Sequence, residues 1–469
     1  MRPSWIGALL LAASCGGDGD GRGDAGRDAG GADAGADAGP DAGGADAGSD
    51  ASASDGGIDG GPDGDADAGA PDAGAEPTEA LRPVPGEVTI LLLRLPGLVR
   101  LGEAAILVGP DGTLVLMDVG NSSHADVVRD MVRALNTSWI TPARGFPRAR
   151  RPLEVDWIVV SHFHSDHVGG FEDLVSGAGA VEVTRGIVHR GATDVGASLN
   201  EGHFETFCGL LSGPLAARAF PLCTAAPPAP CRRADWSGAH PATECAGLFL
   251  GALDDALDDA LGAPSYVSLG GGARMAFVAA SGFVSDGARA HPMPAFGHSD
   301  SNEENARSVV TLIEHGAFRY HWGGDLTGSG DPGEPDVESH LVAFAGPRFY
   351  EALGSDVVQA HHHVRRTSSN ATFVGALVPL DGRSRNVVGG INGGHAGSPH
   401  REVLARFGDD GRLGDGRIWI TMSAVGGGSH PTLVNADADV IVQTLGGGAG
   451  YRVQAARATP ESRAYRSVR

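Results

Sequence analysis

Residues 161–170, SHFHSDHVGG, decide the fold that we expect for this chain. They follow an apolar run, EVDWIVV, that is typical of a buried strand, and they precede a helical pattern. His162 and His164 are two positions apart on a chain leaving a strand, so their imidazoles point the same way and can bind one ion. Asp166 and His167 lie on the next turn, where they can bind a second ion. Because Zn²⁺ favours this mixture of imidazole and carboxylate donors, the stretch predicts a metal centre rather than a solvated loop.

The segments on both sides of this stretch alternate between strand and helix patterns, which indicates an α/β domain. Several of the strands deliver polar residues at their C-terminal ends, as the stretch itself does. A Gly-rich turn closes the last hairpin. The predicted strands and hairpins lie at 87–95, 104–120, 154–162, 273–280, 308–325, 357–363 and 439–455, and the predicted helices at 124–135, 169–178 and 399–407.

Residues from about 191 to 264 interrupt this pattern. Four cysteines lie there, at positions 208, 223, 231 and 245. An even number of cysteines in an exported chain predicts two disulfides, and a zinc site is the alternative. The spacings contain no CxxC pair, which favours disulfides. We therefore expect an insertion that is held together by disulfides beside the metal site.

The N-terminal residues 1–15 have the pattern of a signal peptide, with Arg2 followed by a short apolar run that ends in LAASC. The small residues before Cys15 are similar to a bacterial lipobox, which predicts a lipid on Cys15. An ordinary signal peptide, cleaved nearby, is the alternative. We expect an extracytoplasmic lipoprotein, and Gly16 after the cysteine favours the outer membrane.

Residues 16–80 are built almost wholly from Asp, Ala and Gly, so they cannot bury enough apolar surface to fold, and they predict a disordered tether. Residues 16–75 hold 15 Asp against two Arg, a balance of −13 within the net charge of −23 of the whole chain. The rest of the chain is therefore only mildly acidic and gives no strong nucleic-acid signal. The chain contains no Lys, which excludes a lysine nucleophile.

The metal stretch resembles the HxHxDH signature of the metallo-β-lactamase superfamily. Asp118-Val119-Gly120 is similar to the Asp-x-Gly motif of that superfamily, Asp325 in HWGGD to its metal-bridging carboxylate, and AHHHV at 360–364 to its late His motif. The resemblance covers roughly residues 85 to 455 and implies a four-layer αββα sandwich. We accordingly expect a hydrolase domain over 82–455, with the insertion outside the resemblance.

The resemblance also implies the ligands and the chemistry. Within the late His motif we favour His362 as the ligand, and the implied metal ligands are His162, His164, Asp166, His167, Asp325 and His362. One or two ions, Zn²⁺ or alternatively Mn²⁺ or Fe, would acidify a bound water. Asp166 or Asp325 would orient this water and accept its proton, and His361 or His363 would steady the negative charge of the transition state.

Within the superfamily, the chain looks most similar to ComEC-like proteins and to the choline-phosphate esterases related to them. Asn305-x-x-Ser308 resembles their NxxSxV motif, and PHREVL, with His400, resembles their HPHPEVL. Many superfamily members supply a third His to the first metal. No residue clearly matches it here, and His189 and His298 are the candidates.

The expected function is hydrolysis of a phosphodiester outside the cytoplasm, on a small or short substrate. An Arg-rich run at 143–151 could contact a phosphate backbone, but a solvated loop is the favoured interpretation. Hydrolysis of a carbonyl ester, lactone or thioester is the alternative within the same fold, and a β-lactam is less favoured. A surface binding module without catalysis is the third possibility.

Overall fold

The structure is a computed structural model, and it describes residues 82–97, 101–191, 201–225, 242–253, 264–293, 302–329, 335–350, 354–457 and 462–468. The signal peptide and tether predicted over residues 1–15 and 16–80 lie outside these ranges, as do Cys15, Cys231 and His298. The described residues belong to one unit of the chain, residues 69–469. Within that part, no helix combines the length and apolarity needed to cross a membrane.

The first sheet has nine strands in the order β21-β20-β19-β1-β2-β3-β4-β5-β6. It contains the strand that leads into the metal stretch, and β3, β4, β5 and β6 run parallel to one another. The bounds of its strands are β1 (Thr89–Leu92), β2 (Ala105–Val108), β3 (Leu114–Met117), β4 (Glu154–Val160), β5 (Glu182–His189), β6 (Ala219–Pro221), β19 (Val440–Leu445), β20 (Gly450–Ala455) and β21 (Ser462–Arg466).

The second sheet follows the order β12-β11-β10-β13-β14-β15-β16-β17-β18, with β9 paired to β10. From β14 to β18 its strands are parallel. Its strands are β9 (Tyr266–Gly270), β10 (Ala273–Ala280), β11 (Phe283–Ser285), β12 (Ala290–Pro292), β13 (Val310–His315), β14 (Phe318–Trp322), β15 (Val357–Gln359), β16 (Asn386–Gly389), β17 (Ile418–Ile420) and β18 (Leu433–Asn435).

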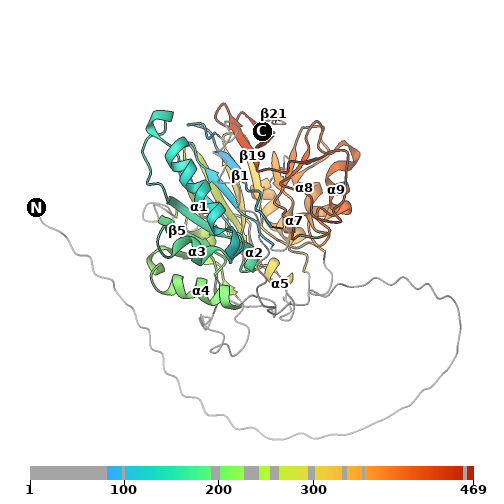
Figure 1. Cartoon of the computed structure of the whole chain (residues 1–469). Coiled ribbons are helices and arrows are strands. Elements are labelled where there is room, and N and C mark those ends of the chain that lie inside the picture. Colours follow the sequence, from blue (N-terminus) through green and yellow to red (C-terminus); the bar gives the residue numbers. More distant parts are fainter. Residues whose placement is uncertain are drawn as a thin grey trace, which may run out of the picture. The chain divides into compact units, whose positions relative to one another are not determined.

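The described helices cover the outer faces of the two sheets, and Figure 1 shows α1 and α3 on one side and α8 and α9 on the other. Short helices also occur in the loops where polar residues gather. The helices are α1 (Ala125–Ala134), α2 (Ser165–Val168), α3 (Phe171–Val175), α4 (Glu201–Ser212), α5 (Asn302–Asn305), α6 (Val337–Ala345), α7 (His361–Val364), α8 (Ala371–Leu377) and α9 (Arg401–Gly408).

Strand β4 shows why the sheets are buried on both faces. Its seven residues are all buried. Trp157 and Val159 pack into the core between the two sheets, which also contains Trp322 of the second sheet. Ile158 and Val160 pack into the core beneath the helices of the first sheet. Alternate side chains therefore enter different cores, as expected for a parallel strand covered on both faces.

A third core lies between the second sheet and its helices, where Val358 of β15 packs with Leu341 of α6 and Phe373 of α8. The layer order is consequently helix, sheet, sheet, helix. The α/β fold class and the four-layer αββα sandwich that we predicted from the sequence are confirmed.

The described parts of residues 191–264 contain both added and integral elements. Helix α4 contributes Phe204 and Phe207 to the core of the first sheet, and β6 extends that sheet beside β5. A separate two-stranded ribbon is formed by β7 (Thr224–Ala225) and β8 (Ala242–Glu244). The insertion that we expected there thus includes at least one strand and one helix that pack as part of the domain.

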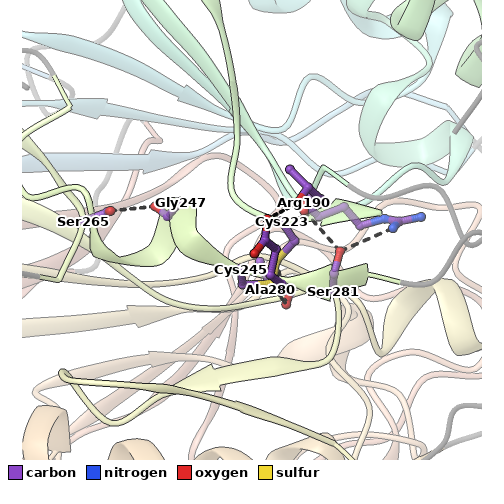
Figure 2. The surroundings of a disulfide bond; sticks show 9 residues. Arg190, Cys223, Cys245, Gly247, Ser265, Ala280 and Ser281 are labelled. Atoms are coloured by element: carbon purple, nitrogen blue, oxygen red, sulfur yellow. Dashed lines mark hydrogen bonds between the residues drawn. A yellow bond between two sulfur atoms is a disulfide. The ribbon is translucent and has the colours of Figure 1, made fainter. Parts of the chain in front are cut away.

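One of the two predicted disulfides, Cys223–Cys245, is present. Figure 2 shows it beside Ala280 and Ser281 of the second sheet and Arg190 at the end of β5. Both cysteines are buried in the core between the sheets, and the Ser281 hydroxyl donates to the Arg190 carbonyl at 3.1 Å. The disulfide therefore fixes the chain after β6 where the two sheets meet. Cys231 lies outside the described residues.

Candidate metal centre

The metal stretch begins where β4 ends, and the alternation of the strand continues for three residues. The Phe163 ring packs against Phe204 and Phe207 of α4, with centroids 5.1 and 5.5 Å apart. His162 and His164 stay together, with Nε2 of His162 3.1 Å from Nδ1 of His164. The buried phenylalanine ring thus anchors the backbone between the two histidines. The two imidazoles lie next to each other, on the side of the chain opposite to that ring, as the alternation of an extended chain predicts.

Four residues from three parts of the chain form a compact cluster: Asp166, His167, Asp325 and His363, with one ligand atom of each lying within 4.8 Å of the others. We call these four residues the Asp-His cluster. His363 Nε2 lies 3.3 Å from both Asp166 Oδ2 and Asp325 Oδ2, and His167 Nε2 lies 3.3 Å from Asp325 Oδ2. Asp166 and His167 follow β4 of the first sheet, whereas Asp325 and His363 follow β14 and β15 of the second, so both sheets contribute to the cluster.

The Asp-His cluster has the properties of a divalent metal site. Asp325 Oδ1, His167 Nε2 and His363 Nε2 are all buried without a hydrogen-bond partner. Buried polar atoms are nearly always paired, so three unpaired atoms on residues of one compact cluster point to an ion. Two carboxylates with two imidazoles are a suitable donor set for Zn²⁺ and similar cations. The residues present therefore fit the metal that the sequence predicts.

Charges within the Asp-His cluster are balanced. Burial alone would raise the pKa of Asp325, but His363 and His167 outweigh it and hold that pKa well below its usual range. The pKa of Asp166 is lowered in the same way. Burial would lower the pKa values of His167 and His363, but the neighbouring carboxylates raise both well above the ordinary value. A divalent ion that displaced two imidazole protons would keep this balance.

His167 is oriented by the Asp118 carboxylate, which the sequence matched to the Asp-x-Gly motif. Asp118 Oδ2 accepts a hydrogen bond from His167 Nδ1 at 2.7 Å, and the Ser161 hydroxyl donates to the same oxygen at 2.6 Å. Asp118 lies at the end of β3 with φ of 57°, a left-handed conformation. This arrangement leaves His167 Nε2 without a proton and facing Asp325 whenever the imidazole is neutral.

His363 has a matching outer partner that sequence reasoning missed. Its Nδ1 lies 3.0 Å from the Gly390 carbonyl and 3.1 Å from Glu103 Oε2. The Gln359 side chain donates to the other Glu103 oxygen. Glu103 is 2% exposed, and burial raises its pKa, whereas the His363 imidazole lowers it. The Gly390 carbonyl, which accepts the hydrogen bond, and the Glu103 carboxylate beside it therefore keep the proton of a neutral His363 on Nδ1.

The late His motif is turned by an unusual backbone. His362, His363 and Val364 all have φ between 51° and 61°. This left-handed region is costly for residues other than Gly, particularly for a β-branched residue such as Val364. The turn points neighbouring side chains at different partners. Such strain is maintained where the surroundings over-determine it, as they do at functional sites.

His362, the ligand that we favoured from the sequence, lies at the margin of the Asp-His cluster, and His363 occupies the place within it. His362 Nε2 is 4.0 Å from Asp325 Oδ2 and 3.2 Å from Asn305 Nδ2, and its Nδ1 is 2.7 Å from the Thr367 hydroxyl. His162 approaches Asp325 from the metal stretch at 3.9 Å. Asp325 is thus common to the Asp-His cluster and to a second group made of His162, His164 and His362.

His361, which the sequence offered as a catalytic residue, faces away from the Asp-His cluster. Its Nδ1 is 2.7 Å from Glu338 Oε1, and its Nε2 is 2.9 Å from His321 Nε2. His321 in turn contacts the Tyr350 hydroxyl at 2.8 Å. Both ring nitrogens of His361 are therefore occupied within a buried network. The residue is not placed where negative charge would develop during a reaction.

Of the two candidates for a third histidine, His189 is described, and it is not brought to the Asp-His cluster. His189 ends β5 and packs against Phe163 and Phe207, with its pKa lowered to about 3 by burial. It therefore lies on the α4 side of the metal stretch. His400 is the residue before α9, and His298 lies outside the described part of the chain.

A histidine that we did not single out lies beside the Asp-His cluster instead. The His395 ring stacks on the His363 ring, with centroids 3.6 Å apart and planes inclined by 16°. Its Nε2 is 3.8 Å from Asp166 Oδ2. The only signal in the sequence was a histidine in a Gly-rich loop after a strand, in INGGHAGS, which is too weak to identify a site residue.

The Arg-rich run at 143–151 does not approach the cluster. Arg150 is buried and pairs with Asp156 at 2.6 Å, and Arg148 pairs with Glu154 at 2.6 Å. These partners belong to the start of β4, whereas the metal stretch follows its end, roughly 20 Å away at the usual rise of a strand. Arg148 and Arg150 of this run therefore form ion pairs at the end of β4 that is opposite to the cluster.

Comparisons with known proteins show similarity to the metallo-beta-lactamase superfamily. No curated protein sequence matches it. Among solved structures it is similar to a metallo-beta-lactamase HARLDQ-motif protein of Cronobacter sakazakii, with 16% identity, a TM-score of 0.24, and coverage of 55% of this chain and 73% of that one.

A second similar solved structure is the Zn²⁺-bound PqqB of Methylobacterium extorquens, with 11% identity, a TM-score of 0.25, and coverage of 58% of this chain and 71% of that one. These TM-scores are too low to support a statement about function. The sequence family adds more direct information. Residues 99–238 match the family model of the metallo-beta-lactamase superfamily, whose sandwich fold the two sheets and their helices form.

Proposed function

We propose that this protein is a metal-dependent hydrolase that cleaves a small or short phosphodiester outside the cytoplasm. The observation that supports it most is the Asp-His cluster, a compact group in which three buried side-chain atoms have no hydrogen-bond partner. The match over residues 99–238 supports the hydrolase class. The phosphodiester rests on the resemblance of Asn305-x-x-Ser308 and PHREVL to ComEC-like proteins and choline-phosphate esterases, a branch to which we assign the chain by analogy.

We assign Zn²⁺ as the metal, with Mn²⁺ and Fe as alternatives, and two ions as the full complement. Asp166, His167 and His363 would hold one ion, and His162 and His164 the other, with Asp325 between them. His362 lies where it can complete the second group. When bound, such ions lower the pKa of a bound water and polarise an oxygen of the substrate.

The protein's own residues supply orientation and a dry site. Asp118 and Glu103 hold the imidazoles of His167 and His363. Asp166 and Asp325 have carboxylates held ionised by the neighbouring imidazoles, so each can accept a hydrogen bond from a nucleophilic water. The Asp166 side chain is 11% exposed, and the side chain of His362, at the margin of the cluster, is 9% exposed. The other three residues of the Asp-His cluster are more deeply buried. A substrate therefore reaches the cluster from the side of Asp166 and His362.

The surroundings of the cluster favour a small substrate over a long duplex. A polymer of nucleic acid requires a row of free cations along its path. The Arg-rich run that could have served is occupied by Glu154 and Asp156 at the other end of β4. A shallow hollow of about 880 Å³ is lined by Arg383, Arg463 and Arg466, but it contains none of the cluster residues.

A substrate panel tests the proposed reaction against its alternatives. The purified zinc-loaded protein is assayed with bis-(p-nitrophenyl) phosphate, p-nitrophenyl phosphorylcholine, a lactone and nitrocefin. Turnover of either phosphodiester, lost in the Asp325→Ala variant, supports the proposal. Turnover of the lactone alone would instead favour the carbonyl-ester hydrolase. A protein that takes up no metal and cleaves nothing would favour a binding module.

We further propose that the protein is exported and held by a lipid on Cys15, at the outer membrane. The buried Cys223–Cys245 disulfide supports an oxidising compartment. Metabolic labelling with a palmitate analogue tests the anchor, because label that survives Cys15→Ala would contradict it.

A further inference from the structure

His395 has one ring nitrogen whose protonation is settled by the backbone. The Asn392 amide donates a hydrogen bond to His395 Nδ1 at 3.0 Å. A backbone N–H can only donate, so Nδ1 must carry a lone pair. An imidazole whose Nδ1 accepts a hydrogen bond is neutral, so its single proton must lie on Nε2.

The protonated nitrogen is buried and has nothing to bond. His395 is 0% exposed, and its Nε2 has no hydrogen-bond partner. The nearest carboxylate oxygen, Asp166 Oδ2, is 3.8 Å away, which is too long for a good hydrogen bond. A buried donor without a partner destabilises the folded protein, so its retention needs a reason. The stack on His363 fixes its position beside the Asp-His cluster.

Coordination of a metal by His395 does not explain why its Nε2 has no hydrogen-bond partner. An imidazole coordinates a metal through a lone pair, and a lone pair on Nε2 would require the proton to move to Nδ1. That proton would face the Asn392 amide hydrogen across 3.0 Å. His162 and His362 differ in this respect, because their partners are side chains that can accept or donate in either orientation.

We propose that His395 is a catalytic residue that donates its Nε2 proton in a hydrogen bond to the oxygen of the substrate that gains negative charge. In the proposed reaction this is a non-bridging phosphoryl oxygen, and the substrate class rests on the proposed function. The proton stays on His395, so no bond to it is broken. A fixed donor in a buried site is pre-oriented for the transition state, where removal of one such donor typically costs 10²–10³-fold in kcat.

Two substitutions distinguish the role of the Nε2 donor from that of the Nδ1 acceptor. His395→Asn retains an acceptor near the position of Nδ1 and removes the donor at Nε2, whereas His395→Gln retains an amide donor near Nε2. We expect His395→Asn to lower kcat by about 100-fold or more and His395→Gln by less than about tenfold. Zinc content, measured by mass spectrometry, should stay at the wild-type value in both. His430→Asn is the matched control, since His430 bonds Asp409 and Thr432 away from the cluster.

Two further measurements do not depend on turnover. Long-range proton–nitrogen correlation spectra of histidine-labelled wild-type protein report the tautomer of His395, and we expect the proton on Nε2 with and without zinc. Calorimetric titration of the zinc-loaded protein with inorganic phosphate should show binding about tenfold weaker in His395→Asn than in His395→Gln.

The outcomes distinguish the two proposals. A proton on Nδ1, a loss of zinc in His395→Asn, or equal kcat and phosphate binding in both variants would overturn the role of His395. A wild-type enzyme that cleaves the lactone but no phosphodiester would overturn the proposed substrate. The ratio of kcat between His395→Gln and His395→Asn, measured on the lactone, would then still test the role of His395.

Discussion

The two groups of ligands around Asp325 differ in how completely the protein has arranged them. In the Asp-His cluster, four ligand atoms lie within 4.8 Å of one another, and both imidazoles have a buried carboxylate behind them. In the second group, His162 and His362 stay 3.9 and 4.0 Å from Asp325, and His162 contacts His164.

This difference indicates unequal metal sites. Outer carboxylates fix the tautomer and raise the basicity of a ligating imidazole, and their loss typically costs 10–100-fold in metal affinity. His167 and His363 have such partners, whereas His162 has the Ser161 hydroxyl and His362 has Thr367 and Asn305. We therefore expect the Asp-His cluster to bind its ion first and more tightly.

The largest effect should follow from Asp325→Ala, because Asp325 is common to both groups. We expect both ions to be lost. The activation barrier should rise by several kcal/mol, which lowers the rate of hydrolysis roughly 10³-fold or more. Zinc content and kcat/KM measured on the same sample check this. A variant with full metal content and activity would remove the basis for the proposed function.

Two variants at neighbouring positions test most directly whether the two groups of ligands differ in zinc affinity. His363→Ala should abolish the tight site, with a loss in affinity above the roughly 100-fold that a missing outer partner can cost. His362→Ala should keep one tightly bound zinc per chain and lose the other. Titration with a zinc indicator measures both affinity and stoichiometry, and the reverse pattern would make His362 the ligand of the tight site.

Glu103 tests whether the outer carboxylates explain the inequality. Glu103→Gln keeps the size of the side chain and removes the negative charge behind His363. We expect zinc affinity at the tight site to fall by 10–100-fold while the weaker site is unchanged. Circular dichroism checks that the fold is retained. Unchanged affinity at the tight site would mean that Glu103 fills space without orienting His363.

The two groups should also differ in how their zinc affinity depends on pH. In the metal-free protein the pKa values of His167 and His363 are raised well above 6.5, so protons compete with the ion at and above that pH. Zinc affinity at the tight site should rise with pH by about tenfold per unit for each proton displaced, up to those pKa values. The pKa of His362 is lowered to about 3 by burial, so the weaker site should respond less between pH 6 and 8. Competition with a chelator at the two pH values measures this.

Part of the site could be predicted because its residues are neighbours in the chain. His162, His164, Asp166 and His167 follow one strand, and the spacing alone states which of them share a direction. Asp118 and Asp325 were accessible through motifs at strand ends. Glu103 and His395 were not, since a single Glu or His in an apolar or Gly-rich stretch is indistinguishable from a surface residue.

The choice between His362 and His363 also lay beyond the sequence, because AHHHV offers three adjacent histidines. A left-handed turn at His362, His363 and Val364, which periodicity does not reveal, decides which one faces the cluster. His361, by the same turn, is directed into the network with Glu338 and His321.

The amino-acid sequence by itself determined the α/β fold class, the place of the metal stretch at the end of a buried strand, and the chemistry of its donors. These follow from local periodicity and residue type, which act over a few neighbouring positions. Only the tertiary structure decided which histidine completes the Asp-His cluster, which carboxylates stand behind it, and where His395 points its proton. Those choices depend on contacts between Glu103, Asp325, His363 and His395, which are far apart along the chain and meet only when the two sheets pack.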